Sequence, residues 1–223
     1  MKIKGAIFDM DGTVIDSLMF WDDLWRRIGE KYMNNAEFKP SEEVDKRVRT
    51  MIYVDAMTYF KEYYSIPVSA EEFISFTSGG LEEFYKNVAK IKLGADRLLA
   101  SLKERNVKLC LASATALSKV RYALECHGLL KYFDLVLSCA EIGVGKEKPD
   151  IYLMAKDMMG LSESDICVFE DSFVALETAK AAGFQTVGIY DRYNFEQKRI
   201  PAESDIYLSE GHSHDELIAR IGA

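Results

Sequence analysis

The sequence lacks several features that would mark its class at once. No apolar run approaches the roughly 18 residues that a membrane-spanning helix needs. Met1–Gly5 leads into a short apolar stretch and an aspartate, a pattern unlike a signal peptide. There is no basic excess, because the formal net charge is -8, which argues against non-specific nucleic-acid binding. We therefore expect a cytoplasmic monomer with no membrane or nucleic-acid partner.

Cysteine is scarce, and no CxxC or Cys/His spacing suggests a zinc site. The four cysteines are far apart and mostly in apolar surroundings, so we expect reduced, buried thiols. They are Cys110, Cys126, Cys139 and Cys167. The three histidines have no partner spaced for a metal site or a catalytic triad.

Short apolar runs followed by helical patterns dominate the second half of the 223 residues. Such alternation predicts an α/β fold, a doubly wound, Rossmann-like parallel sheet. The predicted strands span 3–8, 107–112, 135–138, 166–169, 186–189 and 206–208. The predicted core helices span 117–130, 150–159 and 172–182.

A long helical stretch rich in aromatic and charged residues interrupts this alternation after the first strand. Turn signals divide it at 34–35, 40–41, 66–67 and 78–80. The pattern predicts a four-helix cap domain, residues 17–90, inserted into a core domain made of residues 1–16 and 91–223.

Polar side chains follow the predicted strands where the strands end. They are Asp9 and Asp11 after the first strand, Ser113 and Thr115 after the second, Lys146 and Lys148 in the loop beyond the third, and Glu170 and Asp171 after the fourth. Functional groups of an open α/β sheet gather at the carboxyl ends of its strands, so we expect these side chains to converge.

Such a cluster suits phosphoryl transfer. Crowded carboxylates repel one another and favour a cation, and hard oxygen ligands suit Mg²⁺. One aspartate, Asp9, could then attack phosphorus, while Asp11, two residues on, could protonate the leaving oxygen. A nearby lysine would neutralise charge on the transferred group.

These residues resemble the signatures of the haloacid dehalogenase-like (HAD) phosphotransferase superfamily. The segment Asp9-Met10-Asp11-Gly12-Thr13 looks like its DxDGT motif. Ser113, the lysine loop 145–152, and the segments 169–172 and 181–183 match its later signatures in order. A helical cap at this position is similar to that of the β-phosphoglucomutase and phosphoglycolate phosphatase branch.

Roles follow from the resemblance residue by residue. It implies that Asp9 is nucleophile and metal ligand, and that Asp11 is general acid/base and a metal ligand through its carbonyl. It implies that Ser113 binds the transferring phosphoryl group, and that Glu170 and Asp171 hold Mg²⁺. Alignment on 149–152 favours Lys146 over Lys148 as the catalytic lysine, with Glu147 where proline is usual.

The residues that would contact the rest of the substrate can be assigned only more weakly. Thr115, Arg47 and Arg49 are candidate substrate-binding residues, although Thr115 could simply cap a helix and the arginines could be solvated surface charges. Ala175 replaces a usual glycine, and the cap lacks the glycine-arginine segment expected of a sugar-phosphate mutase.

The favoured function is a Mg²⁺-dependent phosphatase that hydrolyses a small phosphorylated metabolite, such as a sugar phosphate, through an aspartyl-phosphate. The alternatives are a phosphomutase of the β-phosphoglucomutase type and a non-catalytic binding protein on the same scaffold.

Overall fold

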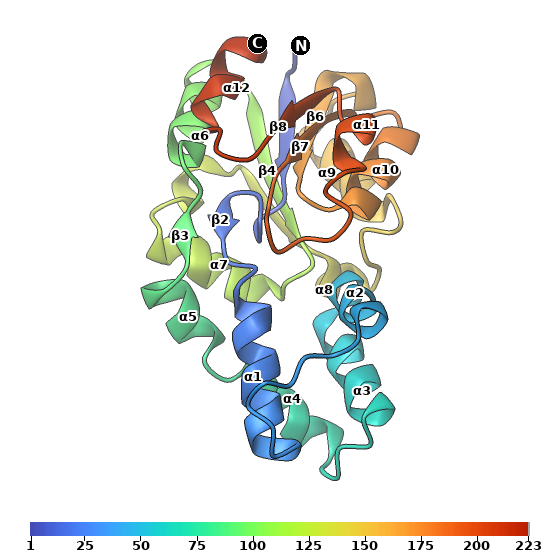
Figure 1. The fold of residues 1–223 in the computed structure, drawn as a ribbon. Helices are drawn as coiled ribbons and strands as arrows, with labels where there is room; N and C mark the ends of the chain where they lie inside the picture. Colours follow the sequence, from blue (N-terminus) through green and yellow to red (C-terminus); the bar gives the residue numbers. More distant parts are fainter. Residues whose placement is uncertain (223) are drawn as a thin grey trace.

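A parallel sheet forms the centre of the computed structural model, which describes residues 1–222 (Figure 1). In that range the sheet has six strands in the order β5-β4-β1-β6-β7-β8. Their bounds are β1 Gly5–Phe8, β4 Lys108–Ser113, β5 Leu135–Ser138, β6 Ile166–Glu170, β7 Gln185–Ile189 and β8 Ile206–Leu208. All six predicted strands are present, with small shifts at their ends.

The register of the sheet brings the polar residues that follow its strands to one edge. β1 is central, and Phe8 lies opposite Leu111 of β4 and Phe169 of β6. All neighbouring pairs are parallel, so the residues that follow Phe8, Ala112 and Phe169 emerge at the same edge. The strands read as continuous apolar runs because helices cover both of their faces.

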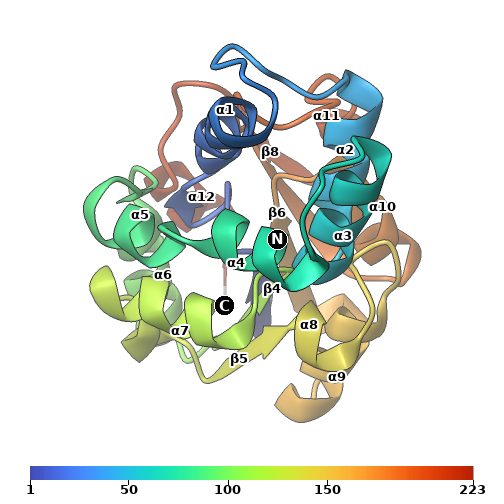
Figure 2. The same cartoon turned by 90° about the horizontal axis from the view of Figure 1, so that it is seen from below.

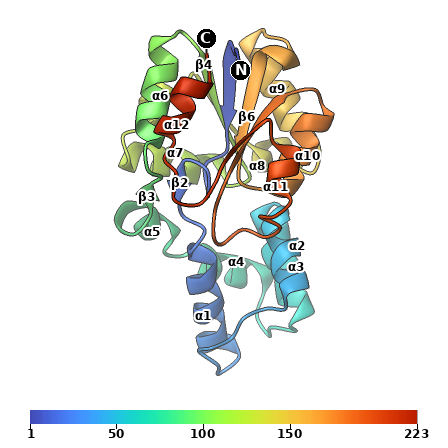
Figure 3. The same cartoon turned by 45° about the horizontal axis from the view of Figure 1, so that its top comes forward.

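The two faces have separate hydrophobic interiors. Phe8, Leu111 and Phe169 share one apolar cluster with residues of α6, α7 and α12, whereas Ile7 and Val168 belong to a second cluster with α9. Figure 3 shows α6 and α12 on one side of the sheet and α9, α10 and α11 on the other. The bounds are α6 Ala95–Glu104, α7 Leu117–Cys126, α8 Cys139–Ile142, α9 Asp150–Met159, α10 Phe173–Ala181, α11 Ile200–Glu203 and α12 Asp215–Arg220.

Two short strands connect the sheet to a helical cap. β2, Ile15–Asp16, pairs antiparallel with β3, Lys90–Ile91, where the chain leaves the core and where it returns. Neither strand was predicted, because two residues are too few to show an alternating pattern. The paired strands hold both connections of the cap side by side.

The cap has five helices among the described residues between β2 and β3, not the four that the sequence predicted (Figure 2). They are α1 Phe20–Tyr32, α2 Glu42–Thr50, α3 Tyr53–Tyr63, α4 Ala70–Ser78 and α5 Leu81–Asn87. The missed break lies at Met51 and Ile52, which carry no glycine, proline or asparagine signal. The turn signals at 34–35 and 40–41 fall within one connection, from α1 to α2.

Two further findings concern membrane-spanning helices and the burial of the cysteine thiols. Within residues 1–222, we find no helix of the length and apolarity required to cross a membrane. Cys110, Cys139 and Cys167 are buried free thiols as expected, but Cys126 is exposed, contrary to the prediction. Cys126 is the last residue of α7, whose buried face is formed by Val120, Ala123 and Leu124.

Candidate active site

A cavity of about 490 Å³ opens between the carboxyl edge of the sheet and the cap. The predicted core residues line it from one side, and cap side chains such as Trp21 and Tyr53 line it from the other. Of the eight polar residues predicted to converge, seven line this cavity: Asp9, Asp11, Ser113, Thr115, Lys146, Glu170 and Asp171. The eighth, Lys148, is exposed and is absent from the lining.

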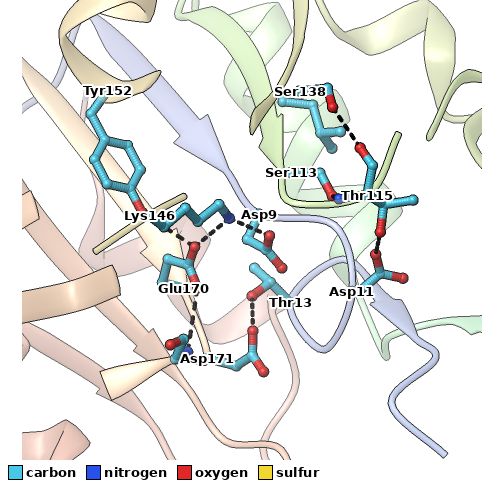
Figure 4. A network of polar contacts seen from close by, with 12 residues as sticks. Asp9, Asp11, Thr13, Ser113, Thr115, Ser138, Lys146, Tyr152, Glu170 and Asp171 are labelled. Carbon is cyan, nitrogen blue, oxygen red and sulfur yellow. Dashed lines mark hydrogen bonds and ion pairs between the residues drawn. The ribbon is translucent and has the colours of Figure 1, made fainter. Parts of the chain in front are cut away.

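Asp9 lies at the centre of the site, directly after β1. Its N–H donates to the carbonyl of Phe169 at 3.0 Å, which fixes the start of the loop against β6. Lys146 reaches across and donates from Nζ to Asp9 Oδ1 and to Glu170 Oε1 (Figure 4). Burial favours the neutral amine, but these two carboxylates raise the pKa of Lys146 well above its ordinary value. The ammonium therefore stays charged between them.

Glu170 and Asp171 extend the cluster from the end of β6. Glu170 also accepts from the hydroxyl of Tyr152 at 3.3 Å. Asp171 accepts from Thr13 Oγ1 at 2.9 Å and from Asn194 Nδ2 at 2.7 Å. Burial, helped by the neighbouring carboxylate of Glu170, raises the pKa of Asp171 to about 7.

The arrangement fits a divalent cation. Asp9, Glu170 and Asp171 are all buried, and each offers a carboxylate oxygen within 4.8 Å of the others. Burial raises the pKa of Asp9 well above its ordinary value, and Glu170, Asp171 and Asp11 add to the rise that Lys146 opposes. A hard cation would relieve this excess of negative charge, and carboxylate oxygens are the ligands that Mg²⁺ prefers.

Asp11 lies on the cap side of the loop and accepts three hydroxyl hydrogen bonds. Ser17 and Tyr85 donate to its Oδ1 at 2.7 and 2.8 Å, and Thr115 donates to its Oδ2 at 2.9 Å. Gly12 directly follows Asp11 and has a φ of +90°. A Cβ there would lie 2.3 Å from an oxygen of Asp171, so only glycine allows both this turn and this approach.

The other predicted substrate-side residues occupy different positions. Ser113, 1% exposed, accepts the N–H of Thr115 at 3.1 Å on its Oγ. Arg47 lines the cavity and stacks its guanidinium 4.3 Å from the ring centroid of Tyr59. Arg49 also lines the cavity, but it binds Asp45 through Nε at 2.7 Å and donates to the carbonyl of Tyr193 at 3.1 Å.

Three residues of the site were missed from the sequence. They are Tyr85, which the sequence shows only as one of many aromatic residues in the cap, together with Ser17 and Asn194. A signal existed for Asn194, since it lies in the loop after β7 and thus follows the same rule of strand ends. Nothing in the sequence distinguishes Tyr85 from other cap tyrosines, because its contact with Asp11 joins residues 74 positions apart.

Known proteins match this chain along most of its length. Residues 3–183 match the sequence model of haloacid dehalogenase-like hydrolases. A phosphorylated carbohydrates phosphatase of Thermotoga maritima is 27% identical over 83% of this chain and 84% of its own. A probable pseudouridine-5'-phosphatase of Drosophila melanogaster is 30% identical over 85% of this chain and 83% of its own.

The fold has solved counterparts as well. The crystal structure of a putative β-phosphoglucomutase from Thermotoga maritima superposes with a TM-score of 0.74 at 25% identity, covering 98% of both chains. These likenesses confirm the predicted resemblance, the predicted α/β fold and the prediction of a hydrolase-type enzyme.

Proposed function

We propose that this chain, which belongs to the haloacid dehalogenase-like hydrolase family, is a Mg²⁺-dependent phosphatase acting on a small phosphorylated metabolite. The observation that carries the proposal is a cluster formed by Asp9, Lys146, Glu170 and Asp171. The cluster lines the same cavity as Asp11, the proposed acid/base residue. Relatives named as phosphatases support it. In this proposal residues 1–16 and 91–223 supply the chemistry and residues 17–90 select the substrate.

The first step uses Asp9 and Asp11. A carboxylate oxygen of Asp9 attacks phosphorus, the bond from phosphorus to the ester oxygen breaks, and the leaving alcohol takes a proton from Asp11. Lys146 holds the other oxygen of Asp9 and contributes positive charge beside the transferring group. Ser113 lines the cavity, and in this proposal its hydroxyl donates to a phosphoryl oxygen.

The second step regenerates the enzyme. Asp11, now a carboxylate, removes a proton from a water molecule as the water oxygen attacks the phosphorus carried by Asp9. The bond between phosphorus and the Asp9 oxygen breaks, which restores the Asp9 carboxylate and releases inorganic phosphate. The three hydroxyls on Asp11 keep its carboxylate aimed into the cavity through both steps. The cap limits access of other water to the cavity.

Asp9, Glu170 and Asp171 would hold the cation, which when bound screens the repulsion between the carboxylates and the phosphate. Thr13 and Asn194 hydrogen-bond to Asp171, and Lys146 bonds to Asp9 and Glu170.

Hydrolysis of p-nitrophenyl phosphate, with Mg²⁺ and with EDTA, tests the proposal. We expect phosphate release with Mg²⁺ and its loss in EDTA, restored when Mg²⁺ is added back. Inactivity under all conditions, on this ester and on a panel of phosphorylated metabolites, would favour the non-catalytic binding protein.

A phosphomutase is the second candidate, because similarity extends to a β-phosphoglucomutase of Bacillus subtilis, 25% identical over 84% of this chain. Here Asp9 would pass its phosphoryl group to a sugar hydroxyl instead of water. Feeding β-glucose 1-phosphate with a trace of the bisphosphate separates the two. Glucose 6-phosphate as product would indicate a mutase, and inorganic phosphate a phosphatase.

A further inference from the structure

A loop that follows β7, residues 191–196, touches both the cluster of carboxylates and the cap. Figure 3 shows the orange-red chain between β7 and α11 descending to the level of α2. Asn194, Phe195 and Glu196 line the cavity. No step of the proposed reaction uses this loop, which we call the 191–196 loop.

The base of the loop is fixed by a buried ion pair. Asp191 is 3% exposed, and its Oδ2 lies 2.8 Å from Nζ of Lys92. Its Oδ1 accepts the N–H of Tyr193 at 2.9 Å, which closes a tight turn. Lys92 directly follows β3, where the chain returns from the cap, so the loop is anchored beside the connection between cap and core.

The middle of the loop holds Asp171. The side-chain amide of Asn194 donates to Asp171 Oδ2 at 2.7 Å and to the Asp171 carbonyl at 2.8 Å. Its own Oδ1 accepts the N–H of Phe195 at 2.8 Å, so both ends of the amide are bonded and its orientation is determined. With Thr13 on Oδ1, Asp171 has one donor on each oxygen and keeps lone pairs for a cation.

The cap binds the residues on either side of Asn194. Arg49 of α2 donates from Nη1 to the carbonyl of Tyr193, and its guanidinium carbon lies 5.1 Å from the ring centroid of Phe195. Asp45, one turn earlier on α2, accepts from Nε and Nη2 of Arg49 at 2.7 and 2.9 Å. The arginine is thus held rigidly on the cap and reaches across to the core.

We infer that Asn194 is a positioning residue for the cation site and that Arg49 couples it to the cap. Cap docking through Arg49 orders the 191–196 loop, the ordered loop fixes Asn194, and Asn194 aims Asp171. By linkage, binding of a cation then favours the docked cap by the same factor as docking favours the cation. In this inference Arg49, a candidate substrate-binding residue from the sequence, acts in the coupling between cap and loop.

Calorimetric titration of Mg²⁺ into the full-length protein tests the inference without any turnover. Replacing a residue that orients a metal ligand typically weakens the metal by about 10- to 100-fold, which we expect for Asn194→Ala. For Arg49→Gln, a residue with no hydrogen bond to Asp9, Glu170 or Asp171, we expect about fivefold weaker binding. Thermal unfolding without Mg²⁺ establishes that each variant is folded.

The chain offers a matched control. Lys119 of α7 forms an ion pair with Glu82 of α5 at 2.6 Å, a second contact between core and cap that does not involve the 191–196 loop. Lys119→Gln should leave the Mg²⁺ dissociation constant unchanged, which separates this coupling from any general effect of loosening the cap.

The inference rests on the proposed function, because it concerns the same cation site, and the two can fail separately. If the unmodified protein binds no Mg²⁺, the metal-dependent function fails and the coupling fails with it. If the unmodified protein binds Mg²⁺ and Asn194→Ala binds it equally well, only the positioning role is overturned. If Arg49→Gln and Lys119→Gln weaken binding equally, only the coupling through Arg49 is overturned.

Discussion

The carboxyl edge of the sheet and the interior of the cap are both buried, but the first is lined by charged side chains and the second by aromatic side chains. At the edge, Asp9, Glu170 and Asp171 lie within reach of one another around Lys146. In the cap, aromatic rings stack on one another. The ring centroid of Phe60 lies 4.9 Å from that of Trp25 and 6.1 Å from that of Phe73. One region keeps charges out of water and the other keeps apolar surface out of water.

This contrast separates function from stability. The raised pKa values of Asp9 and Asp171 mean that their ionised forms are unfavourable in the folded protein without a cation. Stacked rings in the cap carry no such cost and contribute the transfer free energy of large apolar surfaces. Substitutions in the two regions should therefore affect different measurements.

The largest effect is expected from Asp9→Asn. The amide is nearly isosteric but is not a nucleophile, so kcat/KM for p-nitrophenyl phosphate should fall at least about a thousandfold. Removing a carboxylate whose charge is unfavourable should leave the unfolding midpoint unchanged or higher. Steady-state kinetics and thermal denaturation measure the two quantities on one preparation.

Asp157→Asn is the matched control, because this carboxylate on α9 is 74% exposed and does not line the cavity. It should retain full activity. Undiminished turnover in Asp9→Asn would show that Asp9 is not the nucleophile. A large loss of stability in the same variant would contradict the contrast between the two regions.

A comparably large change, but in stability, is expected from Phe60→Ala. Phe60 has no exposed surface and contacts Trp25, Tyr64 and Phe73. Truncating a fully buried phenylalanine costs about 3–5 kcal/mol through lost burial and the cavity that remains. Urea denaturation should show this loss in the free energy of unfolding.

Tyr63→Ala serves as the control on the same helix, because its side chain is 56% exposed. It should cost under about 1 kcal/mol. Equal losses in the two variants would mean that the stack around Phe60 does not stabilise the cap.

The sequence predicted the edge of the sheet far better than the cap, for a physical reason. Asp9, Ser113 and Glu170 could be placed because each follows a predicted strand, and the carboxyl ends of parallel strands meet at one edge of the sheet whatever the strand order. The break at Met51 and Ile52 could not, because nothing local ends α2 there and packing decides it. Contacts between distant segments, such as Tyr85 with Asp11, depend on how the cap sits on the core.

An intermediate effect is expected from His214, which makes the free energy of unfolding depend on pH. Burial, together with the charge of Lys92, lowers its pKa to about 4, and its Nε2 lies 2.9 Å from the Thr13 carbonyl. Between pH 6.5 and 4 the unfolded chain binds this proton and the folded chain does not, so the free energy of unfolding falls as the pH falls. From pH 6.5 to pH 4 the loss from this group should reach about 3 kcal/mol.

Urea denaturation across that range measures the loss. His214→Gln, whose amide can still donate to the Thr13 carbonyl, should flatten the profile relative to the unmodified protein. His212→Gln is the control, because His212 is half exposed and pairs with Glu216. Identical pH profiles for His214→Gln and the unmodified protein would contradict the neutral, buried imidazole.

The smallest effect is expected from a change at Tyr85, a cap residue that contacts the catalytic edge of the core. Tyr85 belongs to the cap, yet its hydroxyl donates to Asp11 Oδ1 at 2.8 Å and burial raises its pKa well above the ordinary value. Tyr85→Phe removes one of three donors on Asp11 and keeps the ring. A single hydrogen bond contributes about 1 kcal/mol, so kcat should fall about fivefold while KM stays constant.

Tyr64→Phe is the matched control for this change. Its hydroxyl accepts the N–H of Ser41 at 3.3 Å, a hydrogen bond within the cap and far from Asp11 along the chain. If only Tyr85→Phe lowers kcat, the cap contributes to the orientation of the acid/base residue and does more than cover the cavity. If neither variant changes kcat, Ser17 and Thr115 suffice to aim Asp11, and the cap helices α1 to α5 contribute nothing to its orientation.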